Sequence, residues 1–156
     1  MKRWLALAAL APFAVFAQEA PKAEPVCVRA EIVPGFESFG RPETGAPAIG
    51  KAVALTLKRV DVPPPVAGAR PFKPGTFAGA YLLTVVKAGT YRVALSQGAW
   101  ISVLRAAGEA PSTAHGHGPA CSGIAKIVSF DLAPGVWHLD LSEAKAAGIT
   151  VAVVAN

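Results

Sequence analysis

AGTYRVALS (residues 88–96) and PGVWHLDLS (residues 134–142) decide the fold, because they are two versions of one strand pattern. Aligned, the two segments pair Tyr91 with Trp137, Val93 with Leu139 and Leu95 with Leu141. Apolar residues at every second position are typical of a strand with one buried face. In the second copy, Trp137 should therefore point inward and His138 outward.

Each copy is the middle strand of a three-strand unit. The outer strands are expected at residues 81–86 and 100–104 in the first unit, and at 126–132 and 149–154 in the second. Residues 87–89 and 133–135 are short glycine-containing links of hairpin length, so we expect each unit to be a meander. The sequence therefore predicts an all-β chain, an antiparallel β-sandwich of jelly-roll type with two similar three-strand halves.

The remaining segments add one strand and several irregular stretches. Residues 53–60 alternate apolar and polar side chains, which predicts a strand. Residues 31–50 are rich in glycine and proline without a sustained period, and residues 62–75 carry five prolines, so both are expected to be irregular. Residues 142–148 contain the only hint of a helix, at most a turn or two.

The first residues have the features of a signal peptide. Lys2 and Arg3 precede an apolar run at 4–16, and Ala17 ends a segment that suits a signal peptidase. The run is shorter than the roughly 20 apolar residues that cross a bilayer. We expect residues 1–17 to be removed, the mature chain to have no membrane span, and the protein to be periplasmic or secreted.

The mature chain has the size of one domain and a mild positive charge. We expect residues 18–50 to form a mostly irregular N-terminal segment and residues 51–156 to form the β-sandwich domain. Loss of Lys2 and Arg3 lowers the formal net charge from +5 to +3, and the basic residues form no run. Nucleic-acid binding needs a basic stripe or patch, so we expect no nucleic-acid partner.

Two cysteines in an exported chain predict one disulfide, between Cys27 and Cys121. A bond that closes so long a loop stabilises the folded state by roughly 4–5 kcal/mol on the chain-entropy model, as an upper figure.

STAHGHGPACSG (residues 112–123) carries the main candidate for a functional site. His115 and His117 are two positions apart, so on extended backbone both imidazoles point to one side and could bind one transition metal ion, zinc, copper or iron. Cys121 would complete a soft ligand set, but a thiolate ligand cannot also be half of a disulfide. The competing interpretation is a glycine-rich turn with solvated histidines, tethered through Cys121.

The histidines also resemble part of the cupin pattern. Gly108, His115 and His117 match its first motif, while Pro134, Gly135 and His138 match its second. This resemblance implies a metal-dependent enzyme of dioxygenase type that uses His115, His117 and His138. Two features of the cupin pattern are missing. No glutamate follows His117 closely, and Pro134 and Gly135 are adjacent where the second motif has one residue between proline and glycine.

About half of the chain resembles a group of small exported bacterial proteins of unknown activity. The most specific pieces are GTYRVALSQGAWI (residues 89–101) and AHGHGPAC (residues 114–121), the second forming an AHGHGP-x-C motif. Some proteins of this group carry the label homogentisate dioxygenase, which implies an iron-dependent cupin. The group differs from this chain at Ser102, where it has an acid, and at Ala125, where it has a basic residue.

Three hypotheses about function follow. The leading one is an exported, non-enzymatic β-sandwich protein with the Cys27–Cys121 bond closed and the His-rich loop exposed for a ligand, a metal ion or an envelope partner. The second is the cupin-like enzyme. The third is a metal carrier or sensor that uses His115, His117 and Cys121, which requires that Cys27 does not pair with Cys121. Trp100 and Trp137 could line a ligand surface, but aromatic residues in strands more often belong to the core.

Overall fold

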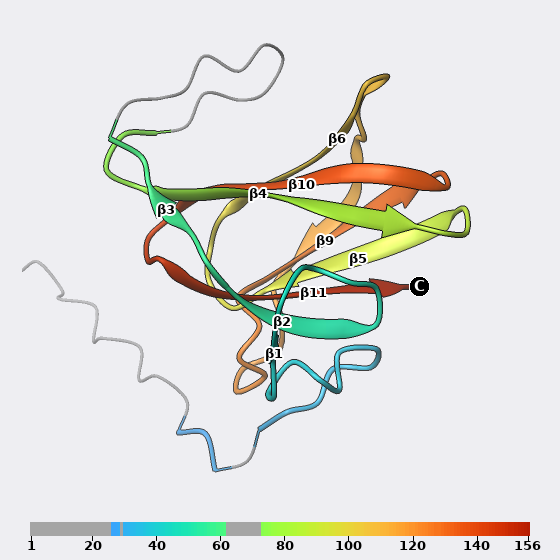
Figure 1. The fold of residues 1–156 in the computed structure, drawn as a ribbon. Coiled ribbons are helices and arrows are strands. Elements are labelled where there is room, and N and C mark those ends of the chain that lie inside the picture. The colour runs from blue at the N-terminus through green and yellow to red at the C-terminus, as the bar shows by residue number, and fades with distance from the viewer. Residues whose placement is uncertain (1–25, 29, 62–72) are drawn as a thin grey trace, which may run out of the picture.

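A computed structural model describes residues 26–28, 30–61 and 73–156 of the chain (Figure 1). These residues form eleven strands and no helix, so the prediction of an all-β chain is confirmed. The predicted signal peptide and most of the proline-rich segment lie outside the described residues. Among the described residues there is no helix that could span a membrane.

The strands form two sheets that lie one above the other in Figure 1. The six-stranded sheet has the order β1 (Glu43–Thr44), β2 (Lys51–Thr56), β11 (Gly148–Ala155), β5 (Gly89–Leu95), β9 (Lys126–Leu132) and β8 (Ser112–Gly116). The five-stranded sheet has the order β3 (Lys58–Arg59), β4 (Phe77–Val85), β10 (Gly135–Ala144), β6 (Trp100–Arg105) and β7 (Gly108–Glu109). Every pairing is antiparallel except β1 with β2.

The two repeated units interlock instead of forming meanders, so the expected hairpins are wrong. The links at residues 87–89 and 133–135 carry the chain from one sheet to the other. As a result β5, the middle strand of the first unit, pairs with β9 and β11 of the second. Equally, β10 pairs with β4 and β6 of the first unit. Each middle strand therefore completes the sheet of the other unit.

Gln97 connects the corresponding turns of the two units. Its Nε2 donates hydrogen bonds to the carbonyl oxygens of Ala146 (2.9 Å) and Gly148 (2.8 Å). Its Oε1 accepts from the backbone N–H groups of Lys145 and Ala146, both at 3.1 Å. The segment 142–148, which hinted at a helix, is instead the end of β10, this turn and the first residue of β11.

One hydrophobic core lies between the sheets and consists of the alternate side chains that point inward from the strands. Trp137, Leu139 and Leu141 of β10 are buried there, whereas His138 is exposed, so the predicted facing of this strand is confirmed. The expected strand at residues 53–60 divides at Leu57 into β2 and β3, which belong to different sheets. Leu57 itself stays buried at that crossing.

A second core covers the other face of the six-stranded sheet. Phe36 and Phe39, from the segment that the sequence predicts to be irregular, pack there on Ala94, Ala152 and other small or apolar residues. The blue segment in Figure 1 runs along this side of the sheet. Both faces of the six-stranded sheet are therefore buried at residues 93–95 of β5 and 151–154 of β11, which could not be predicted from the sequence.

Candidate functional site

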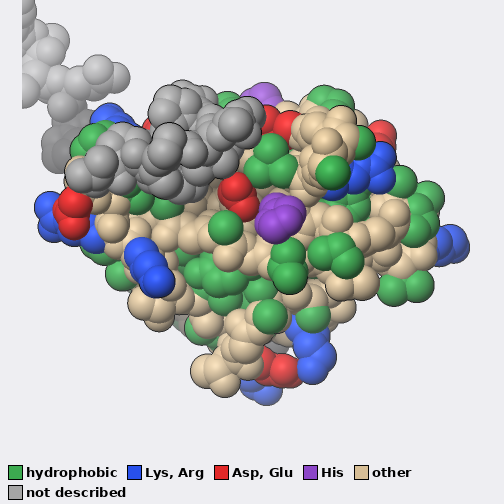
Figure 2. Space-filling view, turned by 45° about the horizontal axis from the view of Figure 1, so that its top comes forward, with side chains coloured by type: hydrophobic (Ala, Val, Ile, Leu, Met, Phe, Trp, Pro, Cys, Tyr) green, Lys and Arg blue, Asp and Glu red, His purple; other side chains and the backbone are tan. Residues whose placement is uncertain are grey.

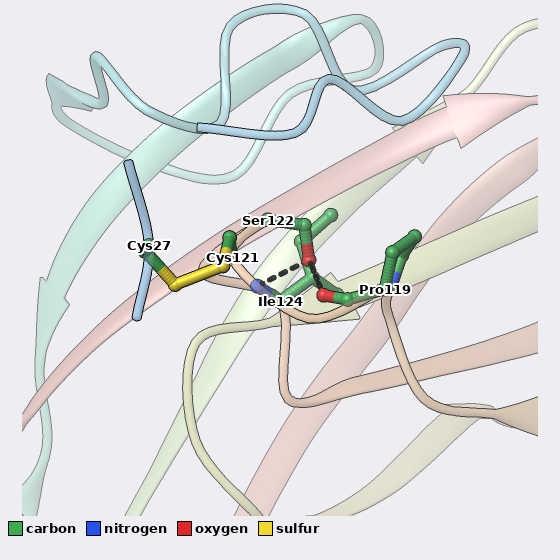
Figure 3. The surroundings of a disulfide bond; sticks show 5 residues. All are labelled: Cys27, Pro119, Cys121, Ser122 and Ile124. Atoms are coloured by element: carbon green, nitrogen blue, oxygen red, sulfur yellow. Dashed lines mark hydrogen bonds between the residues drawn. A yellow bond between two sulfur atoms is a disulfide. The ribbon is translucent and has the colours of Figure 1, made fainter. Parts of the chain in front are cut away.

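The His-rich loop that the sequence predicts at residues 112–123 is only partly a loop, because Ser112–Gly116, with His115, form strand β8. The rest of it, with His117 and Cys121, leads toward β9 and is held to the N-terminal segment at two points. Cys27 and Cys121 form the predicted disulfide, with Cα atoms 5.4 Å apart (Figure 3). Close by, the backbone N–H of Glu31 donates to the carbonyl oxygen of Cys121 at 3.1 Å. The sulfur of Cys121 is therefore occupied, and a metal site that uses it as a thiolate is excluded.

The turn that carries Cys121 is tightly closed. The Ser122 hydroxyl donates to the carbonyl oxygen of Pro119 (2.7 Å) and accepts from the N–H of Ile124 (3.1 Å), as Figure 3 shows. Gly118 lies against this turn, and a Cβ there would come within 2.5 Å of the carbonyl oxygen of Ile124. Gly116, by contrast, has open space around it. Close packing therefore requires glycine at position 118 but not at position 116.

His117 has a fixed orientation although it is exposed. Its Nδ1 lies 2.7 Å from the carbonyl oxygen of Ala125. A carbonyl oxygen only accepts hydrogen bonds, so Nδ1 carries the proton and Nε2 of the neutral ring keeps its lone pair.

His115 faces the space between the sheets at their open edge. It lies opposite Val128 in the β8–β9 pairing, so the two side chains share one face of the sheet. Val128 belongs to the core, but β8 is the last strand of its sheet and His115 stays exposed.

A hollow of about 300 Å³, here called the first hollow, opens beside His115. Its lining comes from both sheets and consists of Trp100, Ile101, Ser112, His115, Lys126 and Val128. The Lys126 ammonium lies 5.5 Å from the centre of the Trp100 ring and donates to the carbonyl oxygen of Ala99 at 2.8 Å. Partial burial lowers the pKa of Lys126, because the charged form loses hydration.

A second hollow, of about 230 Å³, adjoins the first and shares Trp100, Ile101 and Ser112 with it. Its remaining lining residues are Glu109, Ala110, Pro111 and Phe130. We call the two hollows together the edge groove. The groove has an ammonium and an imidazole at one end and an indole in the middle. Glu109 borders the other end, but it lies opposite Leu104, which lies opposite His138, so its side chain belongs to the outer face of the five-stranded sheet.

His138 lies elsewhere, on the outer face of the five-stranded sheet. Its strand neighbours are Leu82 on β4 and Leu104 on β6. His115, in contrast, belongs to the other sheet and faces the space between the two. Across the part of the chain that the structure describes, no three His, Cys, Asp or Glu side chains are grouped to hold a metal ion. The three histidines of the cupin-like hypothesis are therefore not brought together there.

Asp140 shares the outer face with His138. Its Oδ1 is buried without a hydrogen-bond partner. Burial raises the pKa of Asp140, Glu109 raises it further by repulsion, and His138 acts in the opposite direction. Figure 2 shows a face of the molecule on which a histidine lies among acidic and hydrophobic side chains. Leu82 and Val136 are exposed hydrophobic residues of the same sheet.

His115 and Trp100 were candidates from the sequence, whereas Lys126 was not. Trp137 is buried as expected of a core residue, whereas Trp100 is 43% exposed and lines the groove. Lys126 is an isolated charge in the sequence, and only strand pairing brings it to the groove. A lysine that begins an apolar strand, two positions from a core valine, was the available signal for Lys126.

The chain matches no protein-family model, no curated protein and no solved structure. The resemblance to small exported proteins with an AHGHGP-x-C motif therefore stays a prediction.

Proposed function

We propose that the protein is an exported, non-enzymatic β-sandwich of jelly-roll type, stapled by the Cys27–Cys121 bond, and that it binds a small ligand in the edge groove. Disulfides of this kind persist in oxidising compartments, which supports export. The two sheets and the shared core between them support the sandwich.

The observation that carries the proposal is the convergence at the first hollow. Trp100 from one sheet and His115 and Lys126 from the other place an aromatic face, an imidazole and an ammonium around one opening. A few polar groups over an apolar floor are typical of ligand sites, and about 300 Å³ is at the small end of their range.

A thermal-shift panel tests the proposal. The mature protein is heated with amino acids, short peptides, organic acids, sugars and nucleotides, in parallel with the variants His115→Ala and His138→Ala. We expect at least one class to raise Tm saturably in the mature protein and in His138→Ala, but not in His115→Ala. No shift with any class, or equal shifts in both variants, would overturn the proposal.

The orientation of His117 favours a second candidate, a transition-metal site made by His115 and His117. Metal-binding histidines commonly donate their other N–H to a carbonyl oxygen, as His117 does to Ala125. Elemental analysis of tag-free protein, made in an oxidising compartment without chelator, tests this candidate. About one equivalent of zinc, copper or iron that is lost in His115→Ala/His117→Ala would support it, and metal-free protein would refute it.

A further inference from the structure

Lys126 places a positive charge in the space between the two sheets. It lies two positions before the core residue Val128 on β9, so the two side chains share the inner face of the six-stranded sheet. The ammonium is partly buried, which removes part of its hydration and lowers the pKa of Lys126. A cation between two apolar sheets is costly unless an anion accompanies it.

No carboxylate among the described residues forms an ion pair with Lys126. The ion pairs between described residues are made by a lysine of β2 and an arginine of β3. Glu109 borders the edge groove, but its side chain belongs to the outer face of the five-stranded sheet, where it acts on Asp140. Among the residues that the structure describes, the lining of the first hollow therefore has a positive charge and no negative one.

The first hollow has hydrogen-bond donors for an anion. An ammonium has three N–H donors, and the carbonyl oxygen of Ala99 accepts one from Lys126 at 2.8 Å. His115 and Ser112 line the same hollow from β8, and an imidazole N–H and a hydroxyl can each donate a further hydrogen bond. A carboxylate accepts several hydrogen bonds through its two oxygens, and the bond from an ammonium is charge-assisted and therefore strong.

The remaining walls of the first hollow are apolar. They are formed by Trp100, Ile101 and Val128, around a volume of about 300 Å³. Beyond Trp100 the second hollow continues with Pro111 and Phe130. A ligand that covers these walls needs an apolar body, and an aromatic ring would gain contact with the indole of Trp100.

We propose that the first hollow binds a small organic carboxylate with an apolar or aromatic body, its carboxylate at Lys126 and His115 and its body against Trp100. This inference rests on the proposed function and names its ligand class. A cationic ligand would be repelled by Lys126, and a neutral sugar would leave the charge of Lys126 without a partner. An inorganic anion would leave the apolar walls uncovered.

Calorimetric titration of the mature protein with phenylacetate, phenylacetamide and acetate tests the inference. Phenylacetamide keeps the ring but has no charge, and acetate keeps the charge but has no ring. Each loss should weaken binding about tenfold, which corresponds to about 1.4 kcal/mol and is within what a charged hydrogen bond or the burial of a ring contributes. No measurable binding of phenylacetate, or equal affinity for phenylacetate and either of the other two, would overturn the inference.

The variant Lys126→Gln tests whether Lys126 causes the preference for the charged ligand, and Lys87→Gln is the matched control. Both variants remove one positive charge. Lys126 pairs with Leu95 at the end of β5, whereas Lys87 is exposed and precedes the start of that strand. We expect Lys126→Gln to bind phenylacetate and phenylacetamide with equal affinity, and Lys87→Gln to keep the tenfold preference for phenylacetate.

A preference that survives in Lys126→Gln, or that both variants lose alike, would overturn the inference. If Lys126→Gln fails to fold, the three ligands on the mature protein and on Lys87→Gln decide the matter.

The same series separates this inference from the proposed function. If phenylacetate shows no preference over phenylacetamide but some class in the thermal panel gives a His115-dependent shift, the carboxylate assignment is wrong and the ligand site stands. If no class gives such a shift, both proposals fail.

Discussion

Gly116 and Gly118 of the His-rich loop look alike in the sequence but differ in the folded protein. A Cβ at Gly118 would meet Ile124 and the Ser122 hydroxyl, whereas one at Gly116 would meet nothing within 4 Å. We expect Gly118→Ala to destabilise the protein by about 1–3 kcal/mol, as overpacking does, and Gly116→Ala to cost under about 1 kcal/mol. Urea unfolding of the two variants measures the difference. Equal costs would show that the turn is not closed as described.

Asp140 carries a stability penalty that depends on pH. Burial raises its pKa above the ordinary value of 3.8, so the folded state binds the proton more tightly than the unfolded chain does. When the pH is above the pKa of Asp140 in the folded state, the carboxylate is ionised and the free energy of unfolding is lower. This loss disappears as the pH falls below the ordinary pKa of 3.8.

The variant Asp140→Asn should remove the penalty. We expect its Tm to exceed that of the unchanged protein by a few degrees at pH 7, and the two to converge near pH 3. Thermal melts followed by circular dichroism across this range provide the measurement. A lower Tm at pH 7 would mean that attraction to His138 outweighs burial.

The N-terminal segment belongs to the fold although its sequence shows no period. Phe36 is 2% exposed on the outer face of the six-stranded sheet, and Arg92 of β5 holds the segment there. Its guanidinium donates to the carbonyl oxygen of Pro34 at 3.0 Å and lies 5.0 Å from the centre of the Phe36 ring.

Substitutions in this segment should therefore differ with burial. Phe36→Ala should cost about 3–5 kcal/mol, as for other buried phenylalanines. Ile32→Ala, at a side chain that is 68% exposed, should cost less than about 0.5 kcal/mol. Denaturant unfolding measures both, and similar values would show that the segment does not pack on the sheet in solution.

Strands could be predicted from the sequence, but their partners could not. Alternation placed Trp137 inside and His138 outside, because side chains of a strand point to opposite faces whatever lies beside it. The short links at residues 87–89 and 133–135 are compatible with a hairpin and equally with a crossing between stacked sheets. The pairing of β5 with β9 and β11 depends on contacts distant in sequence, and no local residue specifies them.

The candidate site shows the same limit. His115 belongs to a motif and could be predicted, and the cysteine pairing followed from there being only two cysteines in an exported chain. Lys126 has no motif, since its closeness to Trp100 exists only after β6 and β9 have joined their sheets. In the six-stranded sheet, the small residues Ala94 and Ala152 were the available sign that another segment, here the one with Phe36 and Phe39, packs on its outer face.

The disulfide acts on the whole molecule. It joins residues 94 positions apart and holds the start of the described chain to the His-rich loop. Cys27→Ser, Cys121→Ser and the double variant should each lower the free energy of unfolding by about 2–5 kcal/mol, and by similar amounts. Unfolding of the three proteins in parallel checks this. A Cys27→Ser variant as stable as the unchanged protein would show that the bond contributes nothing to the fold.

The account's central claim is that the edge groove is where the protein binds its ligand. Backbone-amide NMR with the ligand class that gives the His115-dependent thermal shift tests it most directly. We predict that saturable chemical-shift changes centre on Trp100, His115 and Lys126, with the Trp100 indole N–H among the largest. Changes centred instead around Phe36 or His138, or no saturable changes with any ligand class of the thermal panel, would contradict the claim.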